Sequence, residues 1–405
     1  MKVLLVSHTC MSRTAGQPKA HCLAAFPNVE LTVLVPDRMR TYGQWQSAET
    51  PEAPDFRYIA GRTRWRSVLN QWHLQHYADA LPGLLREVQP DIVDIWEEPW
   101  GLSCAQAVWL TRRLCPQAKI IVETEQNIFK RLPPPFRQFQ DYSLRRADFV
   151  VARSREALAV ARRKGYVGPA DVVPNAVDCA LFRPLPAAPH PAGEFVIGYV
   201  GRLVPEKGLA DAVAALALLP DRARLVLVGD GPFRPALEEL SRRAKVESRV
   251  RFAGSVPLSD LPAHMNAMDA LVLPSHTTAT WKEQFGRVLI EAGACGLPVV
   301  GSDSGAIPEV IGGAGLTFPE GDPAALADRL RTLLDHPERR AEYGRVGQER
   351  ARGLYSWQRV AEQMHTIYEH LVSEHLVSEH LVSEDPAGQQ SAYQQSAAPG
   401  EGGLR

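Results

Sequence analysis

The sequence predicts an α/β protein built from two doubly wound domains. Short runs of valine, isoleucine and leucine alternate with longer amphipathic stretches along the chain. Near-continuous apolar strands that are each followed by a helix are typical of parallel sheets covered on both faces. The alternation occurs in two series separated by a proline-rich segment, which predicts two sheets and therefore two domains.

The first series predicts an N-terminal domain over residues 1–178. Helical patterns at 77–88 and 104–114 lie between the apolar segments. The opening MKVLLVS has only four consecutive apolar residues after Lys2, whereas a signal peptide needs about 7 or more, so it is expected to be a buried strand. The expected strands are residues 2–7, 30–36, 91–96, 119–124 and 148–154.

The second series predicts a C-terminal domain over residues 195–352. The preceding segment, 179–194, is expected to be a linker because residues 178–194 contain four prolines, which a sheet centre cannot accept. Ligands of open α/β sheets bind beyond the carboxyl ends of the strands, so a cleft between the domains is the expected site. The expected strands are residues 195–201, 224–230, 249–254, 270–275, 298–303 and 315–319.

The C-terminal segment has a different character. Residues 369–384 repeat a five-residue unit, and each unit turns a helix by about 500°, so the leucines do not form one apolar stripe. We expect residues 373–405 to prolong the preceding helix, fray and then be disordered, because their composition is polar and low in complexity.

Composition excludes some classes of function. The formal net charge is −1, which gives no reason to expect a nucleic-acid partner, and the six cysteines include no C-x-x-C pair, as is usual for reduced thiols. We therefore expect a cytoplasmic protein. Residues 130–164 contain ten basic and three acidic residues, which indicates either a solvated face or a contact with anionic lipid or polysaccharide.

Two glutamates at an expected helix start are candidates for chemistry. Glu283 and Glu291 lie eight positions apart around a helix that should begin near Arg287. Three interpretations are open: a helix cap, a metal site and a grip on a polar ligand. The chain has no Asp-x-Asp sequence and His276 is the only imidazole close in sequence, so a metal site is disfavoured.

Two cations form a second candidate site. Arg202 and Lys207 flank a turn that Gly208 closes before the next expected helix. The helix dipole opposes cations at this end, so they suit an anion such as a diphosphate, although solvated surface charges are the alternative. The segment is not a P-loop, and Arg234 replaces a small residue of the dinucleotide fingerprint, which disfavours an NAD enzyme.

Four motifs in order resemble the C-terminal domain of retaining GT-B glycosyltransferases of family four, the group 1 type. They are GRLVPEKG, LVGDGP, FAGSVP and EQFGRVLIEAGACGLPVVGSDSGAIPEVI. The resemblance is strong over about residues 195–350 and looser over the N-terminal half. The resemblance implies two Rossmann-like domains facing across a cleft, the first on the acceptor side and the second binding a nucleotide sugar. It also implies a C-terminal helix, about residues 355–372, that crosses back to the N-terminal domain.

The resemblance implies roles for individual residues. Glu283, in the Glu-x7-Glu pair, would hold hydroxyls of the donor sugar, while Arg202 and Lys207 would neutralise its diphosphate, and these three form the implied catalytic set. No metal or cofactor is implied. The implied donor-binding residues are Glu291 at the ribose, Phe285, Gly286, Arg287 and Gly16.

The N-terminal half departs from the family pattern. Many relatives carry a histidine after the fourth strand, where this chain has ETEQNIFK, so Glu125, Gln126 and Asn127 are the candidates for its role. His8 either lines the cleft or is a polar residue at a strand end. Four tryptophans are candidates for stacking on sugar rings, with core packing as the alternative: Trp65, Trp72, Trp96 and Trp100.

The resemblance thus implies a metal-independent hexosyltransferase that retains anomeric configuration. The expected partners are a nucleotide-sugar donor and a saccharide or glycolipid acceptor, in cell-envelope or exopolysaccharide synthesis, with a peripheral contact at the inner membrane face. A nucleotide-sugar epimerase of the same fold and a non-catalytic sugar-nucleotide-binding protein are the alternatives.

Overall fold

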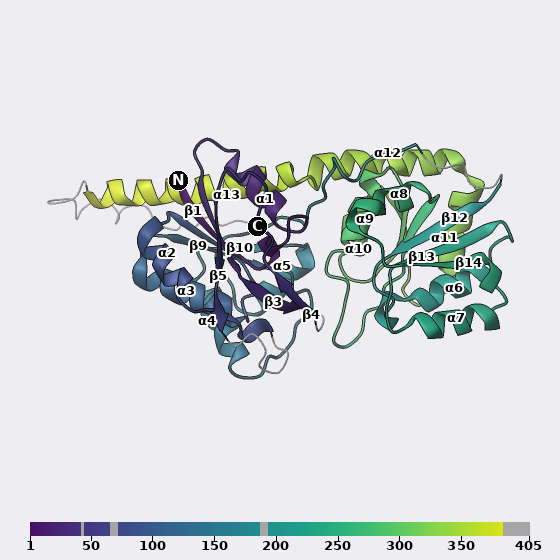
Figure 1. The fold of residues 1–405 in the computed structure, drawn as a ribbon, viewed down its shortest axis with the longest axis horizontal. Coiled ribbons are helices and arrows are strands. Elements are labelled where there is room, and N and C mark those ends of the chain that lie inside the picture. The colour runs from purple at the N-terminus through teal and green to yellow at the C-terminus, as the bar shows by residue number, and fades with distance from the viewer. Residues whose placement is uncertain (42–43, 65–71, 187–192, 384–405) are drawn as a thin grey trace, which may run out of the picture.

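The computed structural model describes residues 1–41, 44–64, 72–186 and 193–383. Figure 1 shows two α/β domains side by side, with two long helices running along one edge of both. Each domain is built on a parallel sheet, so the two doubly wound domains expected from the sequence are confirmed.

The N-terminal domain contains a seven-stranded sheet with the order β11-β10-β9-β8-β1-β2-β5. Every pairing in it is parallel, and the central β1 pairs Leu4 with Val93 on one side and with Thr32 on the other. The strands are β1 (Lys2–Ser7), β2 (Glu30–Pro36), β5 (Arg57–Gly61), β8 (Ile92–Trp96), β9 (Lys119–Thr124), β10 (Phe149–Ala152) and β11 (Ala170–Val172).

Successive residues of the central strand face different helices. Val3 and Leu5 pack with α1 and α13, whereas Leu4 and Val6 pack with α2 and α3. This sheet therefore has helices on both faces, which explains its continuous apolar strands. The helices are α1 (Gln17–Ala24), α2 (Ala80–Val88), α3 (Leu102–Leu114), α4 (Phe136–Arg146), α5 (Arg155–Arg163) and α13 (Trp357–Ser383).

Two short antiparallel pairs stand apart from this sheet and were not expected from the sequence. The first joins β3 (Arg38–Thr41) to β4 (Gln44–Ser47), and the second joins β6 (Thr63–Arg64) to β7 (His76–Tyr77). They lack a continuous apolar run, so the pattern that identifies buried strands does not identify them.

The C-terminal domain contains a six-stranded parallel sheet with the order β14-β13-β12-β15-β16-β17. Its strands are β12 (Phe195–Val200), β13 (Ala223–Val228), β14 (Val250–Gly254), β15 (Ala270–Leu273), β16 (Val299–Ser302) and β17 (Gly315–Phe318). The helices around it are α6 (Leu209–Ala217), α7 (Arg234–Arg243), α8 (Leu261–Asn266), α9 (Arg287–Ala294), α10 (Ile307–Ile311), α11 (Pro323–Asp335) and α12 (Pro337–Leu354).

The chain crosses between the domains twice, and the two crossings touch. The backbone N–H of Val177 donates to the carbonyl of Tyr355 at 2.8 Å, and Val177 also forms a parallel bridge with Ser356. Phe182, only a few residues later, is buried in the C-terminal core. The segment expected as a linker, 179–194, therefore packs in its first part against the C-terminal domain, and residues 187–192 lie outside the described chain.

The last helix returns to the N-terminal domain, as Figure 1 shows. α13 begins at Trp357 and buries Val360, Met364 and Ile367 in the core that it shares with α1. It continues to Ser383, so the repeats after residue 372 prolong the helix, as expected. The disorder expected further on falls on residues 384–405, outside the described chain. Every helix in the described residues is too short or too polar to cross a bilayer.

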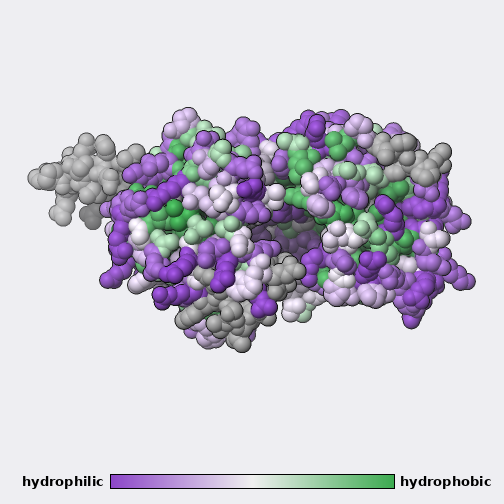
Figure 2. Space-filling model, in the orientation of Figure 1, coloured by the Kyte–Doolittle hydropathy of each residue, from purple (hydrophilic) through white to green (hydrophobic). Residues whose placement is uncertain are grey.

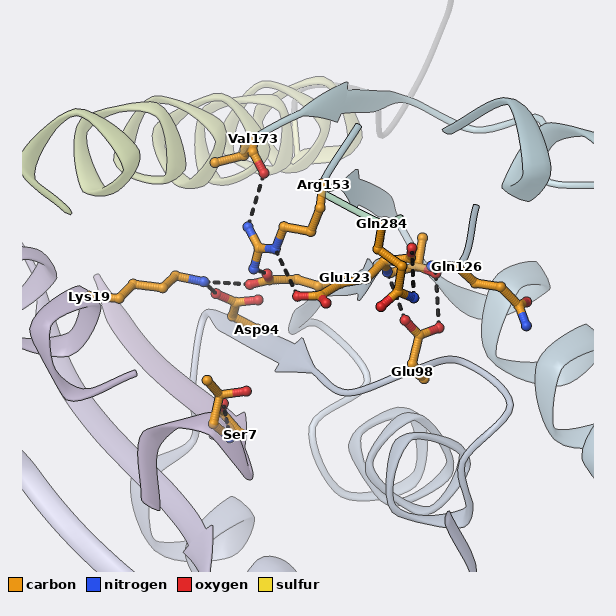
Figure 3. Close-up of polar contacts among 12 residues, drawn as sticks. Ser7, Lys19, Asp94, Glu98, Glu123, Gln126, Arg153, Val173 and Gln284 are labelled. Atoms are coloured by element: carbon orange, nitrogen blue, oxygen red, sulfur yellow. Dashed lines mark hydrogen bonds and ion pairs between the residues drawn. The ribbon is translucent and has the colours of Figure 1, made fainter. Parts of the chain in front are cut away.

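A buried network of charges joins α1, α13 and the middle of the N-terminal sheet (Figure 3). Nζ of Lys19 lies 3.3 Å from Oδ2 of Asp94 and also contacts Glu123. Arg153 binds Glu123 from the other side, and the four side chains are at most 1% exposed. The hydroxyl of Tyr368 donates to Oδ2 of Asp94 at 2.6 Å. Buried charges of this kind are tolerated only when each is paired.

We predict that Tyr368→Phe lowers the stability of the N-terminal domain. The change removes a hydrogen bond to a buried carboxylate, which costs about 1.5–3 kcal/mol. The expected fall in Tm is roughly 2–4 °C for each kcal/mol, measured by thermal unfolding. Tyr343→Phe in α12 is the matched control, because Tyr343 is a partly buried helical tyrosine of the other domain. Equal changes of Tm in the two variants would contradict an anchoring role for Tyr368.

Candidate functional site

Two adjoining cavities open between the domains, beyond the carboxyl ends of the sheets. The larger has a volume of about 710 Å³ and is lined by both domains, whereas the smaller, of about 320 Å³, is lined by the C-terminal domain. Trp281, Lys282 and Gln284 line both, so the cavities are neighbours. Figure 2 shows a hydrophilic recess between the two halves of the molecule.

The smaller cavity brings together residues that the sequence analysis singled out. Arg202 and Lys207 come from the turn after β12, and Glu283, Gly286 and Arg287 come from the segment that begins α9. Lys282 and Glu206 also line the cavity. Cations therefore outnumber acids here by four to two, which favours an anionic ligand.

The turn that carries the two cations needs a glycine. Gly208 has φ +65° and ends the 3₁₀ turn Pro205–Lys207 just before α6. A Cβ at this position would lie 1.7 Å from the carbonyl oxygen of Pro274, so no other residue fits without moving the backbone. The hydroxyl of Tyr199 donates to the carbonyl of Arg202 at 2.9 Å and fixes the other end of the turn.

The carboxylate of Glu283 is held from two sides. Nζ of Lys207 donates to its Oε2 at 2.6 Å, and Oγ of Ser275 donates to the same atom at 2.9 Å. α9 begins at Arg287 as expected, but it follows Gly286 and has no side-chain cap. The helix-cap interpretation of Glu283 is therefore wrong, because its carboxylate is bound to Lys207 and Ser275 instead. A helix start without a side-chain cap can bind an anion, although the N–H of Leu289 already donates to the carbonyl of Gly286 at 2.8 Å.

Three other residues expected to bind the donor, Glu291, Phe285 and Gly16, are not among the residues that line the smaller cavity. Glu291 is half-buried one turn into α9, with Oε1 4.0 Å from Nη2 of Arg287, and burial raises its pKa while Arg287 lowers it. The ring of Phe285 is buried against Tyr355, so only its backbone can face a ligand. Gly16 packs on the backbone of Thr9, where a Cβ would lie 2.5 Å from the carbonyl carbon.

The wall of the larger cavity comes mainly from the ends of β1, β8 and β9. Each strand runs into polar residues there, and aromatic rings lie among them. Trp65, one of the four tryptophans singled out above, lies outside the described chain. The titratable and aromatic residues that line the cavity include His8, Trp96, Glu97, Glu98, Trp100, Glu125 and, from the C-terminal domain, Trp281.

Charges in this wall are partly paired. Oε2 of Glu97 lies 2.8 Å from Nδ1 of His8, and Oε1 accepts the backbone N–H of His8 at 2.7 Å. Burial lowers the pKa of His8, but the negative charge of Glu97 and its hydrogen bond raise it more. Glu98 accepts hydrogen bonds from the N–H of Glu125 at 2.7 Å and from the hydroxyl of Thr124 at 3.0 Å. His8 therefore lines the cleft rather than simply ending a strand.

The three candidates for the family histidine have different surroundings. Gln126 accepts a hydrogen bond from Lys164, and Asn127 donates to Glu156 and, across the cleft, to the backbone carbonyl of Glu283 at 2.7 Å. The carboxylate of Glu125 has a cation only at 3.8 Å, Nε of Arg153, among the described residues. Burial and the nearby Glu98 raise the pKa of Glu125 to about 7, against the opposing effects of His8 and Arg287.

Glu97, Glu98 and Trp281 were not singled out from the sequence. Two acids directly after the buried strand β8, in the run WEEPW, were the available signal, because polar residues at a strand's carboxyl end face the crevice. Trp281 had no such signal, since it lies in an irregular loop before α9.

The basic run 130–164 is only partly a surface feature. Arg153 is buried in the charge network, and Lys164 is half-buried, where it donates to Gln140 at 2.5 Å. The expectation that all ten charges meet a solvent or a partner is therefore wrong for these two. The exposed members are Lys130, Arg131, Arg137, Arg145, Arg146, Arg155, Arg162 and Arg163. In the described residues, no group of three or more His, Cys, Asp and Glu side chains could hold a metal ion.

The C-terminal domain is similar to a known protein family. Residues 186–350 match the family model described as "Glycosyl transferases group 1". A glycogen synthase of Mycobacterium tuberculosis is 34% identical over 202 residues, which is 49% of this chain and 47% of that protein. A D-inositol 3-phosphate glycosyltransferase of Kineococcus radiotolerans is 36% identical over 226 residues, 49% and 51% of the two chains. The chain thus spans about half the length of these relatives.

Solved structures resemble the whole fold. Sucrose-phosphate synthase of Thermosynechococcus elongatus has a TM-score of 0.70 and 23% identity, over 92% of this chain and all of that one. HepE of Anabaena, crystallised with UDP, has a TM-score of 0.64 and 19% identity, over 95% and 100%. The chain therefore has the expected GT-B fold, and its residues 186–350 are similar to the group 1 glycosyl transferases.

We predict that Glu125→Gln makes stability less sensitive to pH. A pKa raised to about 7 means that the neutral form of Glu125 is favoured on folding; this stability is present below pH 4.5 and is lost as pH rises to about 7. Glutamine does not ionise, so it avoids this loss. Between pH 5 and pH 8 the free energy of unfolding of the variant should therefore rise relative to wild type by roughly 1 kcal/mol after allowance for solvent screening, which corresponds to roughly 2–4 °C in Tm. Glu30→Gln, at the opposite end of the sheet, is the control, and parallel pH profiles for both variants would refute the prediction.

Proposed function

We propose that the protein is a retaining glycosyltransferase that moves a hexosyl unit from a nucleotide-diphosphate sugar to a hydroxyl acceptor without a metal ion. The smaller cavity supports this proposal most directly. It places Arg202, Lys207 and Arg287 around Glu283, at the uncapped start of α9, within a group 1 glycosyl transferase domain.

The donor would lie with its diphosphate in the smaller cavity. Lys207 has three N–H donors, so it can hold Glu283 with one and a phosphate oxygen with another. The amides at the start of α9 add further donors for the same anion. Glu291 lies one turn further along α9, where its carboxylate could accept hydrogen bonds from the ribose hydroxyls.

The reaction then follows from where charge develops. The bond between the anomeric carbon and the phosphate oxygen breaks, and its electron pair leaves with the diphosphate. Arg202 and Lys207 stabilise this growing negative charge, which is the work that a metal ion does in other enzymes. The acceptor oxygen bonds to the anomeric carbon on the same face, and its proton passes to the departing phosphate oxygen. The anomeric configuration is thereby retained through an oxocarbenium-like state.

We propose UDP as the first nucleotide to test, because the Anabaena neighbour was solved with it. The names of the relatives, which include glycogen synthase and an inositol-phosphate glycosyltransferase, support a saccharide or glycolipid acceptor. We further propose a cytoplasmic protein in cell-envelope or exopolysaccharide synthesis, whose exposed basic residues on α4 and α5 contact the anionic inner face of a membrane.

We predict that Lys207→Ala weakens the binding of a nucleoside diphosphate by about 10-fold or more, because it removes a charge-assisted hydrogen bond to phosphate. Calorimetric titration with UDP and GDP measures the affinity, and a Tm at each step verifies folding. Lys2→Ala is the matched control, since Lys2 is exposed at the far end of β1. Equal affinities in wild type and Lys207→Ala would remove Lys207 from the donor site.

The reaction itself has a separate test. A nucleoside diphosphate at 100 times its dissociation constant should stabilise the protein by about 2.7 kcal/mol, which identifies the base by thermal shift. The corresponding nucleotide sugar should then give a glycosylated product with the donor's anomeric configuration, followed by NMR. An inverted product would contradict the retaining mechanism, and interconversion of free donor without transfer would indicate an epimerase.

A further inference from the structure

The larger cavity is the place where an acceptor can reach the donor. It shares Trp281, Lys282 and Gln284 with the smaller cavity, which Glu283 lines. Its volume of about 710 Å³ is enough for one or two sugar units. The segment of Glu125 is tied to the donor side, since Nε2 of Gln284 donates to the carbonyl of Glu125 at 3.2 Å.

The wall offers the two features that bind sugar rings. Trp100 and Trp281 supply aromatic surface, on which the C–H faces of a sugar can pack, whereas the ring of Trp96 is buried and lies against Lys19 and Arg153. Glu97, Glu98 and Glu125 supply hydrogen-bond acceptors for its hydroxyls.

The charged side chains of this wall differ in how far they are already paired within the protein. Glu97 is matched by His8, and Lys282 is matched by Glu156, with 2.5 Å between Nζ and Oε1. Glu98 already accepts hydrogen bonds from Thr124 and the N–H of Glu125. The carboxylate of Glu125 has a long ion pair, a contact of 3.8 Å with Nε of Arg153, and its side chain is 36% exposed. Two cations, Arg40 and Lys130, also line the cavity.

We infer that Glu125 is the acceptor-binding residue, and that it selects an acceptor whose reacting sugar is neutral or carries an amine rather than a phosphate or carboxylate. Above its pKa of about 7, Glu125 is a carboxylate that accepts hydrogen bonds from O–H or N–H groups and, with Glu98 beside it, repels an anion. The test is therefore run at pH 8. The inference rests on the proposed glycosyl transfer, because only that reaction requires a second sugar beside the donor.

The test uses the full chain saturated with UDP, or with the nucleoside diphosphate that gives the largest thermal shift. Glucose, glucosamine, glucuronic acid and glucose 6-phosphate are titrated to about 100 mM by saturation-transfer NMR. We expect glucose and glucosamine to bind about 10-fold or more tightly than the two anionic sugars. Glu125→Gln should weaken glucosamine binding by a similar factor and reduce the discrimination against glucuronic acid. Glu125→Asp, which keeps the charge, should preserve the order of preference.

Several outcomes would overturn the inference. They are equal or tighter binding of an anionic sugar, an unchanged selectivity in Glu125→Gln, and no binding by any of the four sugars. Glu30→Gln is the control for a lost carboxylate far from the cavity. Failure of all nucleoside diphosphates to stabilise the protein would count against the proposed function instead, so the two failures can be told apart.

Discussion

The buried charges around Asp94 and Glu123 are the constraint on which the rest of the N-terminal domain depends. Two carboxylates in the middle of a parallel sheet require cations, and Lys19 and Arg153 supply them from α1 and from the end of β10. Tyr368 adds a hydrogen bond from α13. The same residues thus set the position of the returning helix and the depth of the larger cavity, because Glu123 lies two residues before Glu125.

Much of the fold could be predicted because buried parallel strands have an unmistakable pattern. β1, β2 and β9 have the expected bounds, and the two-domain division follows from the same repeat of strand and helix. The edge strands β5 and β11 were not predicted. An edge strand is covered on fewer sides, so RYIAG and the three residues ADV carry no continuous apolar run.

The site was predictable in one domain and hardly at all in the other. Most residues of the smaller cavity lie in two short segments, 200–207 and 281–288, whose motifs pointed to Arg202, Lys207 and Glu283 from local sequence. The wall of the larger cavity is assembled from His8, Glu97 and Glu125, which are more than 25 positions apart, and each alone is an ordinary strand end. Arg153 shows the same difficulty, since a basic residue in a basic run gives no sign that it is buried.

The contact between the two interdomain crossings has a mechanical consequence. Val177 is bonded to Tyr355 where the chain leaves and re-enters the N-terminal domain, so both connections pass through one pivot. A rotation of the domains about that pivot would leave the bond between the two crossings intact, whereas a sliding motion would break it. Away from it they are joined by contacts such as the ion pair of Lys282 with Glu156 and the buried hydrogen bond from Asn127 to the backbone carbonyl of Glu283. Such a rotation would break these side-chain contacts but would need no strand or helix to unfold.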